Sequence, residues 1–236
     1  VAPFANSPEL RNYSNLVIIE TEQSVFADRI VKEVSLAYSD QKIYIVADSD
    51  KTYANYMKKQ LEGQLKNANI TVVNSSADIQ LDTNMMTGQT APVIAILAND
   101  NDDAGSDFSK RIIDLAKETS GMKSFSMYYH PSFEKNIAEL SNASLVYLMD
   151  RKINTDGDFE KEVLADYKKK YCKAPSKYAV IGFDVVNDML TRENSKGELF
   201  KQMNKPQTQL ATKFEFVRNK NGAYVNQGYR VVRLVP

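Results

Sequence analysis

The chain has 236 residues, of which 43% are apolar and 25% charged, a balance typical of an ordinary globular protein. Its 30 basic and 30 acidic residues give a net charge of zero, which removes any whole-chain electrostatic reason to expect nucleic acid or an anionic membrane as a partner. No apolar run approaches the roughly 18 residues that a bilayer-spanning helix needs, so we expect no membrane span in this chain.

The first two thirds of the chain alternate between short apolar runs and amphipathic segments. The runs that predict strands are 16–19, 42–47, 70–73, 92–98, 124–129 and 145–149. Between them, apolar residues at three- and four-residue spacing predict helices over 24–38, 52–66 and 107–119. Residues 43–47 and 93–97 are continuously apolar, which is typical of strands covered on both faces. The alternation predicts a doubly wound, mainly parallel α/β sheet over residues 16–150.

The pattern changes after Asp150. Two helices are predicted, one charged over 158–171 and one more apolar over 178–190, followed by a polar loop with one short helix over 191–212. An alternating run at 214–218, an Asn-Gly pair at 221–222 and a second run over 223–235 predict a C-terminal β-hairpin.

Four segments in this order resemble the type I periplasmic-binding-protein family, in particular its leucine/isoleucine/valine-binding branch. Residues 1–10 resemble the strand and Ser-Pro-x-Leu turn that lead out of the first lobe, and residues 42–53 resemble the first strand of the second lobe with its Asp-x-x-Tyr loop. Residues 166–176, ending in Ala174-Pro175-Ser176, and residues 178–186, reading Tyr-Ala-x-x-Gly-Phe-Asp, carry the most specific part of the resemblance.

The resemblance implies two lobes, with the chain beginning partway through the first. Residues 1–15 would end the first lobe and form a hinge crossing, and residues 16–150 would form the second lobe. Residues 151–212 would return to the first lobe, and the hairpin 213–236 would pack on the second. Two positions depart from the family pattern, because Ala54 and Cys172 stand where glycine is usual.

A narrower resemblance concerns the ending, residues 222–229. It is similar to envelope proteins of the Bacteroides group that carry a peptidoglycan-binding LysM domain upstream. This resemblance implies a periplasmic or cell-envelope location and a link to peptidoglycan through the upstream domain.

In a doubly wound sheet, ligands bind at the carboxyl ends of the strands, beside helix N-termini. The candidate ligand-binding residues are polar side chains that follow the predicted strands: Thr21, Gln23, Ser24, Asp50, Tyr53, Asn99, Asp100, His130 and Asp150. Ser24, Asp50 and Asp107 also fit helix N-caps, and Tyr53 also fits a lid over the end of the sheet.

Other chemistries find little support in the sequence. The acidic loop 99–103 invites a calcium interpretation, but it lacks the spacing and terminal Glu of an EF-hand. His130 is the only histidine and Cys172 the only cysteine, so neither a catalytic His set nor an intrachain disulfide can be built. No Gly-rich phosphate loop or Gly-x-Ser-x-Gly elbow is present. We therefore expect no catalytic residue, no metal and no cofactor.

Two functions remain open. The first is a non-catalytic receptor that closes two lobes on a small polar, amino-acid-like ligand. The second is a cell-envelope interaction or scaffold module that has kept the fold without transport. The effector domain of a transcription repressor is a third possibility, which the neutral charge and the Tyr-Ala-x-x-Gly-Phe-Asp segment disfavour.

Overall fold

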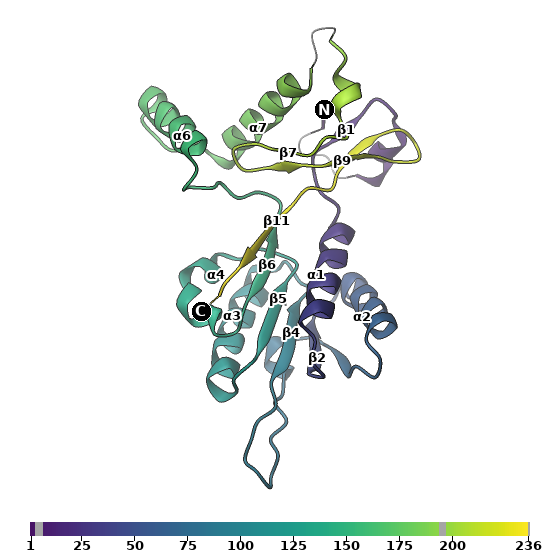
Figure 1. The fold of residues 1–236 in the computed structure, drawn as a ribbon, viewed down its shortest axis with the longest axis vertical. Coiled ribbons are helices and arrows are strands. Elements are labelled where there is room, and N and C mark those ends of the chain that lie inside the picture. The colour runs from purple at the N-terminus through teal and green to yellow at the C-terminus, as the bar shows by residue number, and fades with distance from the viewer. Residues whose placement is uncertain (3–6, 194–196, 236) are drawn as a thin grey trace. The chain divides into compact units, whose positions relative to one another are not determined.

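A computed structural model describes residues 1–2, 7–193 and 197–235 (Figure 1). The chain divides into two compact units, each assembled from separate stretches of sequence. Unit 1 contains residues 1–22 and 150–230, and unit 2 contains residues 23–149 and 231–236. The chain therefore passes between the units three times. Residues 3–6 of the expected hinge crossing and 194–196 of the expected polar loop lie outside the described residues.

Unit 2 is built on a six-stranded sheet in the order β11-β6-β5-β4-β2-β3. The strands are β2 (Lys42–Val46), β3 (Ile70–Val73), β4 (Val93–Leu97), β5 (Lys123–Ser126), β6 (Val146–Met149) and β11 (Arg230–Arg233). All neighbouring pairs from β3 to β6 are parallel. Every residue of β4 is buried, as its uninterrupted apolar sequence predicts for a strand covered on both faces.

Helices cover both faces of this sheet. They are α1 (Gln23–Ala37), α2 (Thr52–Gln64), α3 (Asp102–Glu118), α4 (Pro131–Lys135) and α5 (Ile137–Ser141), with a 3-10 turn η2 (Ser76–Asp78). Tyr44 and Val46 of β2 belong to the buried cluster formed with Phe108 and Ile112 of α3. Since side chains alternate along a strand, Ile43 and Ile45 face the other way, where α1 and α2 contact the sheet. The doubly wound, mainly parallel α/β sheet predicted from the sequence is confirmed.

Unit 1 combines helices with small sheets. Its elements are η1 (Pro8–Asn12), β1 (Val17–Ile18), α6 (Asp158–Tyr171), α7 (Lys177–Arg192), η3 (Leu199–Gln202), β7 (Gln207–Thr208), β8 (Lys213–Phe214), β9 (Phe216–Arg218) and β10 (Tyr224–Asn226). The order β1-β10-β9 forms one sheet and β7-β8 another. A buried cluster of Val17, Ile19, Met203, Phe214 and Phe216 lies at the centre of this unit.

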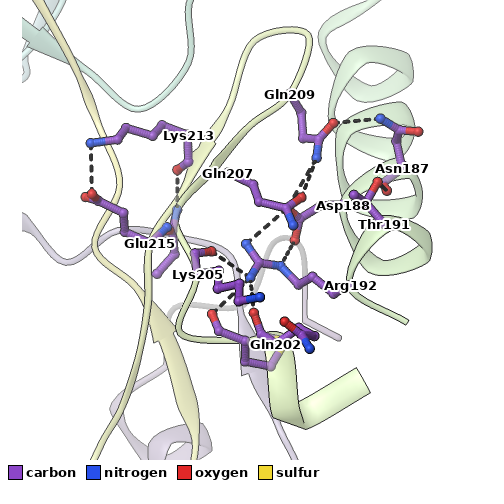
Figure 2. A network of polar contacts seen from close by, with 12 residues as sticks. Asn187, Asp188, Thr191, Arg192, Gln202, Lys205, Gln207, Gln209, Lys213 and Glu215 are labelled. Carbon is purple, nitrogen blue, oxygen red and sulfur yellow. Dashed lines mark hydrogen bonds and ion pairs between the residues drawn. The ribbon is translucent and has the colours of Figure 1, made fainter. Parts of the chain in front are cut away.

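A fully buried ion pair and its partners fix the polar interior of unit 1 (Figure 2). The guanidinium of Arg192 bonds both carboxylate oxygens of Asp188, at 2.6 and 3.1 Å. Its Nη1 also donates to the carbonyl oxygens of Gln202, Met203 and Lys205 at 2.8–3.0 Å. Gln209 donates to Asp188 at 3.3 Å. The end of α7 is therefore joined to the irregular segment that follows it by charge-assisted hydrogen bonds.

Two parts of the architecture differ from the sequence-based expectation. Residues 16–19 were expected in the sheet of the second lobe, but β1 pairs in parallel with β10 in unit 1. The hairpin 213–236 was expected to pack on the second lobe, but β9 and β10 pair in unit 1 and only β11 enters the six-stranded sheet. The run divides at Gly228, where a Cβ would lie 1.9 Å from the carbonyl oxygen of Lys213. Only glycine fits this approach, and it lies in the segment that separates β10 from β11.

No helix among the described residues is long and apolar enough to cross a membrane.

Candidate functional site

The carboxyl ends of β2, β4 and β5 meet at one edge of the unit 2 sheet and border a cleft of about 380 Å³. Its lining is entirely polar apart from one alanine: Gln23, Asp48, Ser49, Asp50, Tyr53, Ala98, Asn99, Asp100, Asn101 and Tyr128. The parallel strand order produces this arrangement, because loops that follow parallel strands emerge at the same edge. Five of the residues predicted from the sequence come together here: Gln23, Asp50, Tyr53, Asn99 and Asp100.

Tyr128 and Gln23 join two walls of the cleft. The Tyr128 hydroxyl donates to Gln23 Oε1 at 2.9 Å, which connects the segment after β5 to the first residue of α1. Burial raises the pKa of Tyr128 well above its ordinary value, and the nearby Asp100, Tyr53 and Asp50 raise it further. The phenol therefore remains a neutral hydrogen-bond donor, and the potential around it is negative.

Side-chain hydrogen bonds to the backbone shape the loops that carry the carboxylates. Asp50 Oδ1 accepts from the Thr52 backbone N–H at 2.9 Å at the start of α2, and hydrogen bonds from Thr52 lower the pKa of Asp50. Asn99 Oδ1 accepts from the N–H of Asn101, and Asn101 Oδ1 accepts from the N–H of Asp103, both at 2.9 Å. Asn101 is thus the N-cap of α3, and these turns hold the loop after β4 in a defined conformation.

A second cleft of about 270 Å³ adjoins the first and shares Asp48, Asn99 and Asn101 with it. It extends along the same edge toward β3. Its remaining lining residues are Val46, Asn74, Ser75, Ser76, Asp103, Ala104 and Asp107. Neither cleft has a lysine or arginine among its lining residues. The edge therefore presents carboxylates, amides and hydroxyls, a set that suits cationic and hydrogen-bonding groups better than free anions.

The carboxylates do not gather around a single point. Within the described ranges, no group of three His, Cys, Asp or Glu side chains is placed to hold a metal ion. The spread of Asp48, Asp50 and Asp100 around a cleft of this size fits an organic ligand with several polar contacts better than one metal ion.

The other four predicted residues lie outside the cleft lining. Ser24 is half-buried in the first turn of α1, directly after Gln23. His130 is the N-cap of α4, where its Nδ1 accepts from the Ser132 N–H at 3.1 Å and its ring packs against Phe133. Asp107, expected as a helix cap, lies inside α3, because that helix begins at Asp102.

Thr21 and Asp150 belong to unit 1. Thr21 Oγ1 donates to the carbonyl oxygen of Gly228 at 2.6 Å. Asp150 is paired with Arg151 at 2.6 Å, and Arg151 also bonds Glu20 at 3.2 Å. Within unit 1, Thr21 thus links the segment after β1 to the segment after β10, and Asp150 contacts its chain neighbour Arg151.

Five further residues line the cleft outside that set: Asp48, Ser49, Ala98, Asn101 and Tyr128. Tyr128 was missed because the strand was predicted to continue to residue 129, whereas β5 ends at Ser126. The two serines in the run that begins at Lys123 could have signalled this earlier end, since Ser126 Oγ accepts from the Tyr128 N–H and turns the chain.

Solved structures with the same fold include type I periplasmic binding proteins. A putative branched-chain amino acid ABC transporter protein from Rhodospirillum rubrum is 12% identical with a TM-score of 0.64, over 99% of this chain and 69% of that one. An ABC transporter substrate-binding protein from Desulfitobacterium hafniense, in complex with Leu, is 12% identical with a TM-score of 0.53, over 97% and 68%. LpoA from Haemophilus influenzae is 11% identical with a TM-score of 0.52, over 97% and 42%.

These likenesses establish the fold. The chain has the type I periplasmic-binding-protein architecture that the sequence predicted, and it spans about two thirds of the length of the transporter proteins it matches. No family model matches the sequence. No curated protein matches it either. The upstream LysM domain and the Bacteroides-type ending stay predictions from the sequence.

Proposed function

We propose that this protein is a non-catalytic receptor that binds a small polar ligand at the carboxyl edge of the six-stranded sheet. The observation that carries the proposal is the cleft in which Gln23, Asp50, Tyr53, Asn99 and Asp100 come together. A sheet of this kind binds ligands at that edge, and the lining offers hydrogen-bonding groups of both polarities. The solved Leu complex of the Desulfitobacterium hafniense protein supports an amino-acid-like ligand.

The charge of the cleft defines which end of the ligand this unit contacts. Three carboxylates, on Asp48, Asp50 and Asp100, and the rings of Tyr53 and Tyr128 surround the space. An ammonium group is attracted both to carboxylates and to aromatic faces. We therefore place the ammonium end of an amino-acid-like ligand in this cleft. A ligand carboxylate would be repelled here and would need donors from elsewhere in the protein.

A receptor of this type acts outside the cytoplasm, so we place the protein in the periplasm or cell envelope. The alternative function is an envelope interaction or scaffold module, linked to peptidoglycan through an upstream domain. The two functions differ in whether a small molecule stabilises the chain.

Calorimetric titration and thermal unfolding with a panel of amino acids and small amines test the proposal. A ligand at 100 times its Kd raises the free energy of unfolding by about 2.7 kcal/mol, which is readily detected. Asp100→Asn should weaken binding of an amine-bearing ligand about tenfold, because a charge-assisted contact is lost. The matched control is Asp114→Asn, which removes an exposed carboxylate from α3 away from the cleft. If no member of the panel binds, the envelope alternative is favoured.

A further inference from the structure

The turn that joins α6 to α7 carries a dense group of lysines. Five occur within ten residues: Lys168, Lys169, Lys170, Lys173 and Lys177. We call residues 168–178 the lysine turn. All five side chains are exposed, and none has a carboxylate partner within the described part of the chain. By contrast, Lys58, Lys110 and Lys117 each pair with an acid on their own helix.

Stabilisation of the helix ends explains the presence of only some of these lysines. Lys168, Lys169 and Lys170 lie in the last turn of α6, where a cation interacts favourably with the negative end of the helix dipole. Lys177 is the first residue of α7, where the dipole has the opposite sign and a cation is disfavoured. Ser176 already caps this helix by accepting from the Ala179 N–H at 3.2 Å. Lys177 therefore does not serve the stability of the helix that it begins.

Two exposed tyrosines accompany the lysines. Tyr171 closes α6 and Tyr178 is the second residue of α7, with 49% and 60% of their surfaces exposed. The Lys170 ammonium lies 5.5 Å from the ring centre of Tyr171, and the Lys177 ammonium lies 5.1 Å from that of Tyr178. Each aromatic ring is thus presented together with a cation at the same turn of the chain.

We propose that the lysine turn is a docking surface for an anionic lipid membrane. Tyrosines together with long lysine side chains are the residues that proteins place at the membrane–water interface, where the ring and the methylene stem enter the headgroup region and the ammonium meets phosphate. The group lies on an exposed turn, so it can approach a flat surface. A zero net charge does not oppose this contact, because beyond about 8 Å the remaining charges are screened at physiological salt.

Co-sedimentation of the full chain with vesicles tests the proposal. Vesicles of phosphatidylcholine containing phosphatidylglycerol should bind the protein, and vesicles of phosphatidylcholine alone should not. Each lysine near an anionic surface contributes about a fivefold factor in affinity, so the triple variant Lys170→Gln, Lys173→Gln, Lys177→Gln should bind about 100-fold more weakly. Raising salt to about 1 M should release the wild-type protein, since the screening length falls to about 3 Å.

The control is the triple variant Lys32→Gln, Lys59→Gln, Lys66→Gln, which removes three exposed lysines from unit 2 and gives the same net charge. It should bind the anionic vesicles like the wild type. The proposal is overturned if the wild type does not bind them, or if the two triple variants lose binding equally. Binding to a soluble anionic polysaccharide but not to vesicles would also overturn it and assign the turn to a glycan. Circular dichroism of each variant checks that α6 and α7 are retained.

Discussion

Arg192 and Asp188 form an ion pair on one face of α7 in which neither side chain has any exposed surface. The pair is satisfied on all sides, because Arg192 also donates to three backbone carbonyls and its guanidinium lies 5.1 Å from the ring centre of Phe216. A buried pair of this kind is costly to break from one side, since the remaining charge stays desolvated.

Arg192→Met should therefore lower the free energy of unfolding of unit 1 by about 3–5 kcal/mol, measured by urea denaturation. Lys213→Met provides the comparison, because its pair with Glu215 is about one third exposed on both sides and should contribute less than about 1 kcal/mol. If Arg192→Met lowers the free energy of unfolding by as little as Lys213→Met does, the buried network does not stabilise unit 1.

A second prediction concerns the ion pair between Glu33 of α1 and Arg233 of β11, which joins the last strand to a helix of unit 2. Arg233 bonds both oxygens of Glu33 at 2.6 and 2.7 Å, and Arg29 adds a third contact at 2.6 Å. The hydrogen bond from Arg233 is the main cause that lowers the pKa of Glu33 below its ordinary value. A carboxyl with a depressed folded-state pKa stabilises the fold above its unfolded-state value, and this stabilisation is lost as the pH falls through the folded-state value.

Arg233→Met should accordingly reduce the free energy of unfolding by about 1–3 kcal/mol at neutral pH, and the reduction should shrink toward about pH 3. Urea denaturation of both proteins at the two pH values measures the effect. If the difference in free energy of unfolding between the wild type and Arg233→Met does not change with pH, Glu33 is not the ionised partner of Arg233.

A substitution at Gly105 of α3 tests how closely the His130 ring packs against this helix. A Cβ at this position would lie 2.6 Å from two ring carbons of His130. Alanine in place of glycine normally stabilises a helix by about 1 kcal/mol, but this clash should outweigh that gain and make Gly105→Ala destabilising by about 1–2 kcal/mol. Gly63→Ala in α2 is the matched control, because nothing lies within 4 Å of its added Cβ, and it should stabilise the protein. Thermal unfolding of the two variants decides the sign.

Tyr128 offers a spectroscopic test of the cleft. Because burial and the neighbouring acids raise its pKa, the alkaline absorbance titration of Tyr128→Phe should match that of the wild type up to about pH 10. Asp100→Asn removes one of the nearby charges and should move the Tyr128 titration to lower pH. If Tyr128→Phe removes a component that titrates below pH 10, the cleft is neither as buried nor as acidic as its lining indicates.

Local patterns in the sequence were enough to predict most single elements. The uninterrupted apolar runs at β2 and β4 indicated buried parallel strands, and α6 was predicted with the bounds that the structure shows, Asp158–Tyr171. Partners distant in sequence could not be predicted in this way. Val17 of β1 pairs with Tyr224, and no local periodicity indicates which sheet a strand of two residues joins.

The candidate site shows the same division. The rule that ligands lie after parallel strands selected residues after β2 and β4 that line the cleft, including Asp50 and Asn99. It also selected Thr21 and Asp150, which follow strands as predicted but belong to unit 1, because the chain changes units next to both of them. Which unit a residue joins depends on tertiary contacts that the order of elements alone does not specify.

The return of β11 to the sheet of unit 2 has a consequence for how the protein is made. Unit 2 needs β11 beside β6, and unit 1 needs residues up to 230. A growing chain usually folds domain by domain from its N-terminus, but here unit 2 cannot be completed until β11 has left the ribosome. Until then β6 is an unpaired parallel edge, the kind of edge to which other chains can add. The order of the sequence therefore leaves this edge of β6 open until β11 has been synthesised.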